Sequence, residues 1–351
     1  MIKTLNNSTE IKEYFRLTET KYFKIINSTD FFKNQEEMNK KAIPSKVFFN
    51  HFNAINFLIE NDEDRFNLKK IIFFNNIKIK NVDFELEKCR KLLWNAWSTE
   101  YAFLITSQSE NIDYYRFALH WHFPQVYYSI YLAMTAFHET QGIANDNHEN
   151  SIKLFGNSIK DGHYPLSLQF YVKGDYNNFQ YIGFDEFSGF PKDYSALSRV
   201  YNKQDAELHF ANFLKSTRIQ NAENKRKRGE KEHAKQKDFQ NKKGELIKKF
   251  SKKHWDKIYV SIPETTIFNI MYRLRIKANY HDIETFMNAE IDFKLFHEYL
   301  GNIVHYVNFV HEAYVHKAIG DKNYKKVLYD FNGHILEDRA KFRYESLISK
   351  L

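Results

Sequence analysis

The sequence is poor in cysteine, proline and glycine. Its only cysteine is Cys89, among 351 residues. One thiol cannot close a disulfide within the chain or build a cysteine-based zinc site, so neither is expected. The 5 prolines and 11 glycines are few for this length. Because all-β proteins need many tight turns built with these residues, the sequence predicts a mainly helical protein.

Long apolar runs are absent as well. No stretch of about 18 apolar residues occurs, which is the length that a membrane-spanning helix needs. The first 15 residues, MIKTLNNSTEIKEYF, lack the apolar centre of a secretory signal. We therefore expect a soluble, cytoplasmic protein that has no membrane partner, and we expect neither a metal ion nor a cofactor.

Positive charge is concentrated in one segment, residues 215–257, which we call the basic arm. The chain has a net charge of +8. The basic arm holds 16 Lys and Arg residues against 6 Asp and Glu, whereas the rest of the chain holds 36 against 38. A local excess of this kind predicts a surface that binds a polyanion.

The basic arm is interpreted as a long exposed helix, or as a helical hairpin with a break near Gly229 or Gly244. A solvated helix without a ligand and a contact with a partner protein are the alternatives to nucleic-acid binding. The candidate nucleic-acid-binding residues are Lys225, Arg226, Lys227, Arg228, Lys242, Lys243, Lys248 and Lys249.

Apolar residues at helical spacing predict the other main elements. The expected helices cover residues 45–60, 82–107, 124–142, 152–159, 205–217, 265–286 and 292–319, with a helical tail at 321–351. Residues 166–172 and 179–184 fit short strands or irregular loops. We expect a mainly α protein whose helical bundle is divided by an insertion at 161–254 that carries the basic arm.

Two further segments allow more than one interpretation. Residues 71–79 fit a helix or a strand. Residues 116–122, RFALHWH, are predicted as a strand with His120 and His122 on one side. A histidine pair of this kind can bind a metal ion, but no carboxylate or cysteine partner lies nearby at ligand spacing, so packing is the preferred interpretation.

The stretch 265–286 has the clearest division into faces. Its apolar face is formed by Ile267, Ile270, Met271 and Leu274. Ser261 and Pro263 are typical of a helix start, because serine caps and proline needs no partner there. Arg275, Asn279 and Asp282 project within about 40° of one another on a polar face. Without a ligand, this face is a solvated surface with an Arg–Asp brace.

Two stretches together resemble small bacterial proteins of the HEPN family. Residues 127–155, YYSIYLAMTAFHETQGIANDNHENSIKLF, resemble its tyrosine-rich second helix, with His148 shortly before the next helix. Residues 274–286, LRIKANYHDIETF, resemble its third-helix signature, an Arg-x-Lys-Ala-Asp-Tyr-x-Asp run in which Asn279 replaces the first Asp. The two blocks and their flanking helices cover about 140 of the 351 residues.

The resemblance implies an up-and-down helical bundle that usually dimerises. It divides the chain into an accessory region (1–81), the first half of the bundle (82–160), the insertion (161–254), the second half (255–320) and a tail (321–351).

Many HEPN proteins are metal-independent ribonucleases that use an Arg followed, after four to six residues, by a His. Arg275 and His281 have this spacing, whereas Arg116 and His122 have it in the wrong block. The resemblance implies that Arg275 binds the scissile phosphate and that His281 positions or protonates its oxygens. The candidate catalytic residues are Arg275, Asn279, Tyr280, His281 and Asp282.

Two functions follow as expectations. The first is a metal-independent endoribonuclease of a toxin or phage-defence type that acts as a homodimer and recruits RNA through the basic arm. The second is a non-catalytic HEPN module that binds RNA or a partner protein, in which Arg275 and Asp282 form a structural brace.

Overall fold

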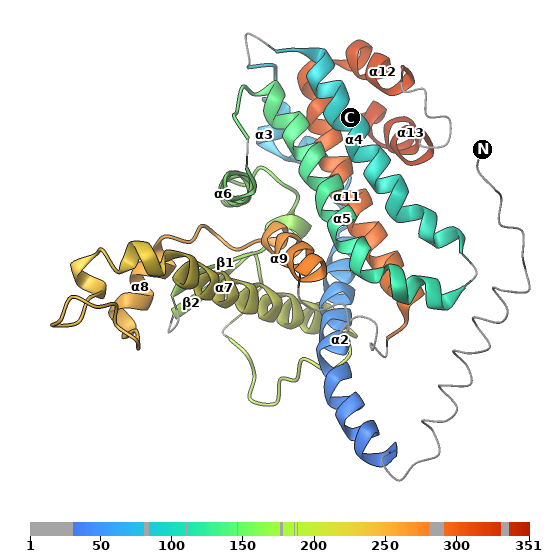
Figure 1. The fold of residues 1–351 in the computed structure, drawn as a ribbon. Coiled ribbons are helices and arrows are strands. Elements are labelled where there is room, and N and C mark those ends of the chain that lie inside the picture. Colours follow the sequence, from blue (N-terminus) through green and yellow to red (C-terminus); the bar gives the residue numbers. More distant parts are fainter. Residues whose placement is uncertain are drawn as a thin grey trace, which may run out of the picture.

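A computed structural model describes residues 31–80, 84–109, 111–145, 147–175, 178–185, 187, 189–280, 291–330 and 337–351. The protein is mainly helical, as the sequence predicts (Figure 1). The long helices are α2 (Phe31–Glu60), α4 (Leu86–Leu104), α5 (Ile112–Thr140), α7 (Lys203–His233) and α11 (Phe293–Ile319). The shorter ones are α3 (Ile72–Asn75), α6 (His148–Lys160), α8 (Lys252–Val260), α9 (Ile267–Tyr280), α12 (Asp321–Tyr329) and α13 (Glu337–Ser346). Single 3₁₀ turns occur at Leu68–Lys70, Ile105–Gln108, Leu166–Leu168, Lys237–Phe239 and Ile348–Lys350.

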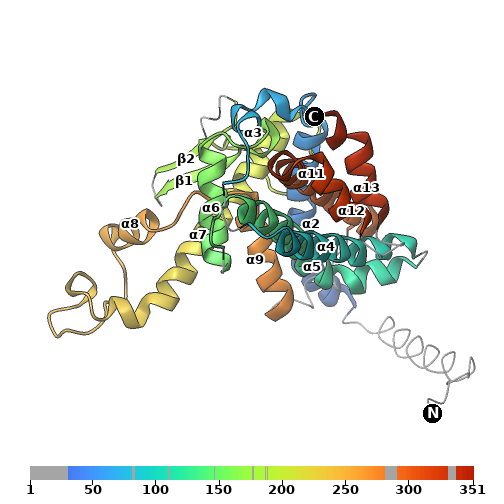
Figure 2. The same ribbon diagram turned by 90° about the horizontal axis from the view of Figure 1, so that it is seen from above.

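Helix α11 lies at the centre of the bundle. It packs against α5 and α2, and α4 packs along α5 (Figures 1 and 2). Nineteen of its 27 residues are buried, so α11 is covered on nearly all sides, as expected for a helix that is apolar around its circumference. Helix α9 crosses α5, and α7 packs on α2. In the described part of the chain, no helix combines the length and the apolar composition that a membrane crossing requires.

The insertion contains one antiparallel strand pair, β1 (Tyr171–Asp175) and β2 (Asn178–Ile182), in which Tyr171 faces Ile182. Of the two segments predicted as short strands or irregular loops, 179–184 contains most of β2, whereas 166–172 begins with a 3₁₀ turn and only its last two residues belong to β1. Apolar side chains of this region, such as Phe170 and Phe210, join the main core. A second, smaller cluster at the base of the basic arm contains Ala222, Ile258, Tyr259 and Ile262. The five-part division of the chain stays a prediction.

The strand expected at 116–122 is wrong, because α5 runs continuously from Ile112 through Pro124. The side chain of Asn111 caps its start by accepting from the amide of Asp113 at 2.9 Å. In a helix, His120 and His122 point about 200° apart rather than to one side. His122 is buried and its Nε2 lies 3.1 Å from Thr106 Oγ1, whereas His120 is half-buried. The ambiguous segment 71–79 contains the short helix α3.

The predicted start of the helix at Ser261 and Pro263 is also wrong. Ser261 instead ends α8, and α9 begins only at Ile267. Between them, Thr265 pairs with Val172 of β1 through two backbone hydrogen bonds of 2.9 and 3.0 Å. This pairing holds the segment extended, so the helix cannot begin before it.

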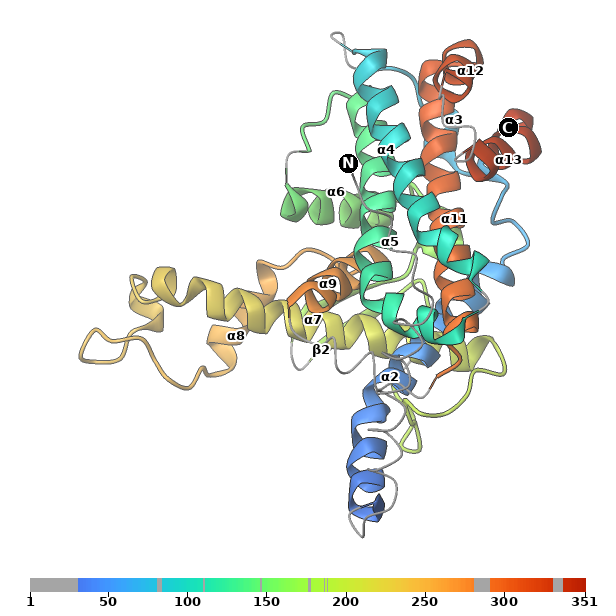
Figure 3. The same cartoon turned by 45° about the vertical axis from the view of Figure 1, so that its right-hand side comes forward.

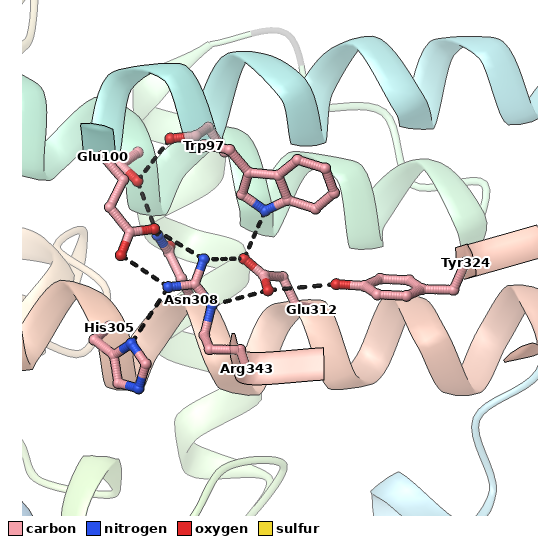
Figure 4. Close-up of polar contacts among 9 residues, drawn as sticks. Trp97, Glu100, His305, Asn308, Glu312, Tyr324 and Arg343 are labelled. Carbon is pink, nitrogen blue, oxygen red and sulfur yellow. Dashed lines mark hydrogen bonds and ion pairs between the residues drawn. The ribbon is translucent and has the colours of Figure 1, made fainter. Parts of the chain in front are cut away.

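Helix α13 is fixed to the bundle by a buried charged network (Figure 4). Arg343 is 0% exposed and donates to Glu100 of α4 at 2.8 Å and to Glu312 of α11 at 2.6 Å. Trp97 donates to Glu312 at 2.8 Å, and Asn308 donates to Glu100 at 3.1 Å. Burial raises the pKa of the Glu100 carboxyl, but the charge of Arg343 together with the hydrogen bonds from Arg343 and Asn308 outweighs burial, and the net shift is downward. The network therefore joins three helices of the bundle through charges that satisfy one another.

Candidate functional site

Three helices bring tyrosines, a histidine and an arginine together at one side of the bundle. Tyr127, Tyr128 and Tyr131 lie on α5, His148 is the first residue of α6, and Tyr272 and Arg275 lie three residues apart on α9. We call this set the Arg275 cluster; its members are Tyr127, Tyr128, Tyr131, His148, Tyr272 and Arg275. Tyr127 takes part in the contact between α5 and α9, because its ring lies 5.2 Å from that of Phe268 and 5.6 Å from that of Tyr272.

The guanidinium of Arg275 lies on aromatic rings. Its central carbon is 5.0 Å from the ring centre of Tyr128, 5.4 Å from that of Tyr127 and 5.5 Å from that of Tyr272. Its Nε is buried and has no hydrogen-bond partner, and among the described residues no carboxylate lies within ion-pair distance of it. Aromatic faces attract a cation but leave its hydrogen-bonding fork unused. This arginine can therefore bind an anion, and its planar fork fits a phosphate.

His148 is held beside this arginine by a hydrogen bond to Tyr127. The hydroxyl of Tyr127 lies 2.8 Å from His148 Nδ1, and the ring of Tyr131 lies 5.0 Å from the imidazole. Burial, and secondarily the charge of Arg275, lowers the pKa of His148, so the imidazole is neutral at pH 7. Burial raises the pKa of Tyr127, which therefore keeps its proton.

The neutral His148 has two tautomers with opposite chemistry. When Tyr127 donates to Nδ1, the other nitrogen, Nε2, carries a proton and is a hydrogen-bond donor. When Nδ1–H donates to the hydroxyl of Tyr127, Nε2 is a base that can accept a proton. The hydroxyl of Tyr127 can thus support either neutral tautomer, one with a donor and one with a base at Nε2.

The structure places only part of the predicted catalytic set. Arg275 is in the cluster. Asn279 and Tyr280 belong to the last turn of α9, but their side chains are outside the described part of the chain, and so are His281 and Asp282. The pairing of Arg275 with His281 stays a prediction.

The histidine beside Arg275 in the described residues is His148, to which sequence analysis gave no chemical role. Its signal was present in the sequence, because the tyrosine-rich stretch and His148 belong to one motif. The alternative pair lies elsewhere: Arg116 sits over the ring of Phe293, and His122 is buried. In the described residues, no three or more His, Cys, Asp or Glu side chains gather as a metal site would require.

The first half of the basic arm reaches the edge of the cluster. Arg228 on α7 lies 3.1 Å from the carboxylate of Glu149, the residue after His148. Lys225 donates to the carbonyl of Ser261 at 2.9 Å, and Lys227 is exposed. The pair between Arg228 and Glu149 places this part of α7 next to the start of α6, so Arg228 lies close to the Arg275 cluster.

Arg226 is anchored rather than presented to solvent. It lies 3.3 Å from Glu223 and 3.6 Å from Glu230, and its guanidinium approaches the rings of Phe250 and Trp255. Of the arm residues predicted to bind nucleic acid, Arg226 is therefore the one that the structure explains by packing.

The outer half of the basic arm is a turn between two helices, not a continuation of α7. Helix α7 passes through Gly229 and ends at His233, and the chain turns at Gly244, whose φ is +80°. The helix therefore breaks at neither predicted glycine: it ends four residues after Gly229, and Gly244 lies in the non-helical segment between α7 and α8. The four lysines of this outer half that were predicted to bind nucleic acid are exposed: Lys242, Lys243, Lys248 and Lys249. Figure 3 shows the arm extending away from the bundle.

Comparisons of the chain with protein-family models, with curated proteins and with solved structures find no match. The HEPN resemblance therefore rests on the two sequence stretches that carry it.

Proposed function

We propose that the protein binds single-stranded RNA at the Arg275 cluster. The observation that carries this proposal is an arginine that rests on three tyrosine rings without a carboxylate partner among the described residues. A phosphate would take the unused fork of Arg275. Tyr128 and Tyr131 are half-buried and present aromatic surface on which unpaired bases stack.

The basic arm supports the same proposal by its position. Arg228 on α7 pairs with Glu149 at the start of α6, and the exposed Lys227 precedes it on the same helix. A strand whose phosphate is bound at Arg275 would continue along these positive charges. Binding that depends on phosphate contacts weakens steeply as salt is added, because each contact releases condensed counterions.

A second function, metal-independent cleavage of the bound RNA, is favoured by the neutral His148 beside Arg275. In this reaction the ribose 2′-oxygen attacks the adjacent phosphorus and the bond from phosphorus to the 5′-oxygen breaks. His148 Nε2 would take the proton from the 2′-hydroxyl, and the protonated imidazole or water would supply one to the leaving oxygen. Arg275 would stabilise the charge on the phosphate, and the products would be a 2′,3′-cyclic phosphate and a 5′-hydroxyl.

The binding proposal is tested with a labelled, unstructured RNA oligonucleotide and fluorescence anisotropy. We expect Arg275→Ala to raise the Kd about tenfold or more, the size of a lost charge-assisted phosphate contact. Lys277→Ala is the matched control, because it removes the same charge from the same helix but Lys277 lies 5.7 Å from the ring of Phe48, outside the cluster. Failure of the wild type to bind at low salt, or an equal loss in both variants, would refute the proposal.

Cleavage is tested with total RNA and transfer RNA in EDTA. Loss of metal-independent cleavage in Arg275→Ala and His148→Gln, with activity kept in His281→Ala, assigns the acid–base role to His148. Loss in His281→Ala instead supports the pair predicted from sequence. If the folded wild type cleaves none of these RNAs but binds them, the protein is a non-catalytic RNA-binding module.

A further inference from the structure

A groove of about 730 Å³ lies on the bundle, away from the Arg275 cluster. It is formed by residues 62–76, which include α3, and by residues 161–169, which follow α6. We call it the Asp64 groove. Two of its lining side chains, Ile72 and Leu166, are 79% and 72% exposed. Large apolar side chains exposed around one groove are typical of an interaction surface.

The floor of the groove is rigid. The ring of Phe73 stacks on that of His163 at 3.8 Å, and Tyr314 donates to the carbonyl of His163. Asp62 accepts from the backbone amides of Asp64 at 3.0 Å and Ser167 at 3.2 Å, which ties the two walls together. The groove is therefore preformed, and a partner would not have to order it.

The charge of the lining is negative although the whole chain is positive. Asp62, Asp64 and Asp161 line the groove, and Lys70 is the one Lys or Arg among its lining residues, paired with Asp64 at 2.6 Å. Three carboxylates against one lysine leave this lining with a net charge of −2. A matching occupant therefore needs apolar side chains for Ile72 and Leu166, and positive charge near the two exposed carboxylates, Asp64 and Asp161.

The outer loop of the basic arm, residues 241–250, has this chemistry. Leu246 and Ile247 are half-buried, and exposed lysines flank them on both sides. The loop is also preformed: the side chain of Asn241 accepts from the amides of Lys243 at 2.9 Å and Glu245 at 3.0 Å. The backbone amide of Ile247 donates a hydrogen bond of 2.9 Å to the carbonyl of Phe239, which closes the turn.

The loop lies too far out to use the groove of its own chain. Figures 1 to 3 place it at the outer end of the arm, whereas α3 lies on the bundle. We propose that loop 241–250 of one copy docks in the Asp64 groove of a second copy. Leu246 and Ile247 cover the apolar rim, and Lys248 and Lys249 pair with Asp64 and Asp161. This contact goes beyond RNA binding at Arg275 and does not depend on it.

The test is a reciprocal charge exchange, read as mass in solution by sedimentation or light scattering without RNA. The groove variant carries Asp64→Lys and Asp161→Lys, and the loop variant carries Lys248→Glu and Lys249→Glu. All four positions are exposed, so we expect each variant to fold. A melting curve of each variant checks this. We expect the wild type to associate and each variant alone to be monomeric.

Mixing the two variants decides the result. Within either variant, the loop and the groove carry like charges and should repel each other. Between the two variants, each loop faces a groove of opposite charge. An equimolar mixture that associates again, while each variant alone does not, supports the proposal. A control with Asp113→Lys and Glu298→Lys, two exposed positions away from the groove, should associate like the wild type. A monomeric wild type, variants that still associate alone, or a mixture that stays monomeric would each overturn it.

Discussion

Arg343 and Arg275 show two ways in which one protein holds a buried or half-buried cation. Arg343 is fully buried and donates to oxygens of two carboxylates. Arg275 is half-buried and lies on three tyrosine rings, and its Nε has no partner. The guanidinium of Arg343 donates its hydrogen bonds to carboxylates of the protein, whereas among the described residues that of Arg275 has no such acceptor.

The difference follows from the cost of burial. A charge taken fully out of water must be paired, or it destabilises the fold by several kcal/mol. Aromatic faces supply only about 0.5–2 kcal/mol, which holds a guanidinium that still reaches water. The pairing of Arg343 therefore indicates a structural role, and the setting of Arg275 is consistent with the binding role proposed for it.

The largest expected effect is on Arg343. Arg343→Ala should lower the free energy of unfolding by about 3–5 kcal/mol, because Glu100 and Glu312 are left buried without their partner. Denaturant titration followed by circular dichroism measures it. Lys341→Ala on the same helix removes a charge without opening the network and should change stability by less than about 1 kcal/mol. A loss as small as this for Arg343→Ala would mean that water enters and pairs the carboxylates.

Acid should destabilise the core through its buried histidines. Burial lowers the pKa of His51 and His311 to about 3 and that of His138 and His297 to about 4. The unfolded chain takes up protons near pH 6.5 and the folded chain does not, so stability is complete above pH 6.5 and falls below it. At pH 5.5, each of these histidines should lower the free energy of unfolding by about 1.4 kcal/mol relative to its value at high pH. Denaturant midpoints that stay constant from pH 7.5 to about 5.5 would contradict the burial of these rings.

Arg275→Ala should reverse the pattern of Arg343→Ala. Only cation–π contacts are lost, so we expect the free energy of unfolding to change by less than about 2 kcal/mol. Short single-stranded RNA should raise the melting temperature of the wild type but not of this variant, because a ligand stabilises only the state that binds it. A large loss of stability would assign Arg275 to the structure, as for Arg343.

The smallest effect is expected at Arg228. Its pair with Glu149 is exposed on both sides and contributes at most about 1 kcal/mol to stability. If Arg228 contacts an RNA phosphate, Arg228→Ala should reduce the slope of log Kd against log salt by about one. Titrations at several salt concentrations measure this slope, and an unchanged slope would place the RNA path away from α7.

Sequence patterns predicted the helices whose buried face repeats regularly. Apolar residues at helical spacing correctly predicted α4 and α11. In 116–122 the two histidines alternate as in a strand, which led to a wrong prediction for a part of α5. The start of α9 was misplaced because the pairing of Thr265 with Val172 is a contact between distant segments that local spacing cannot show.

The two arginine sites were predictable to different degrees. Arg275 was found because it belongs to a motif. Arg343 was missed because it lies in a polar tail whose partners are more than 30 residues away in the sequence. A signal existed in Glu100 and Glu312, which are carboxylates on otherwise apolar helix faces and so require a buried partner.

Tyr127 connects the two functional groups of the Arg275 cluster, since its hydroxyl contacts His148 and its ring lies under Arg275. Burial is the main cause of the lowered pKa of His148, and the positive charge of Arg275 is the second cause. An anion bound at Arg275 would offset this charge. Occupancy and protonation are then reciprocally linked: anion binding raises this pKa, and the proton in turn tightens anion binding. The protein would take up protons as it binds RNA, with an affinity that rises as the pH falls towards the pKa of the bound state.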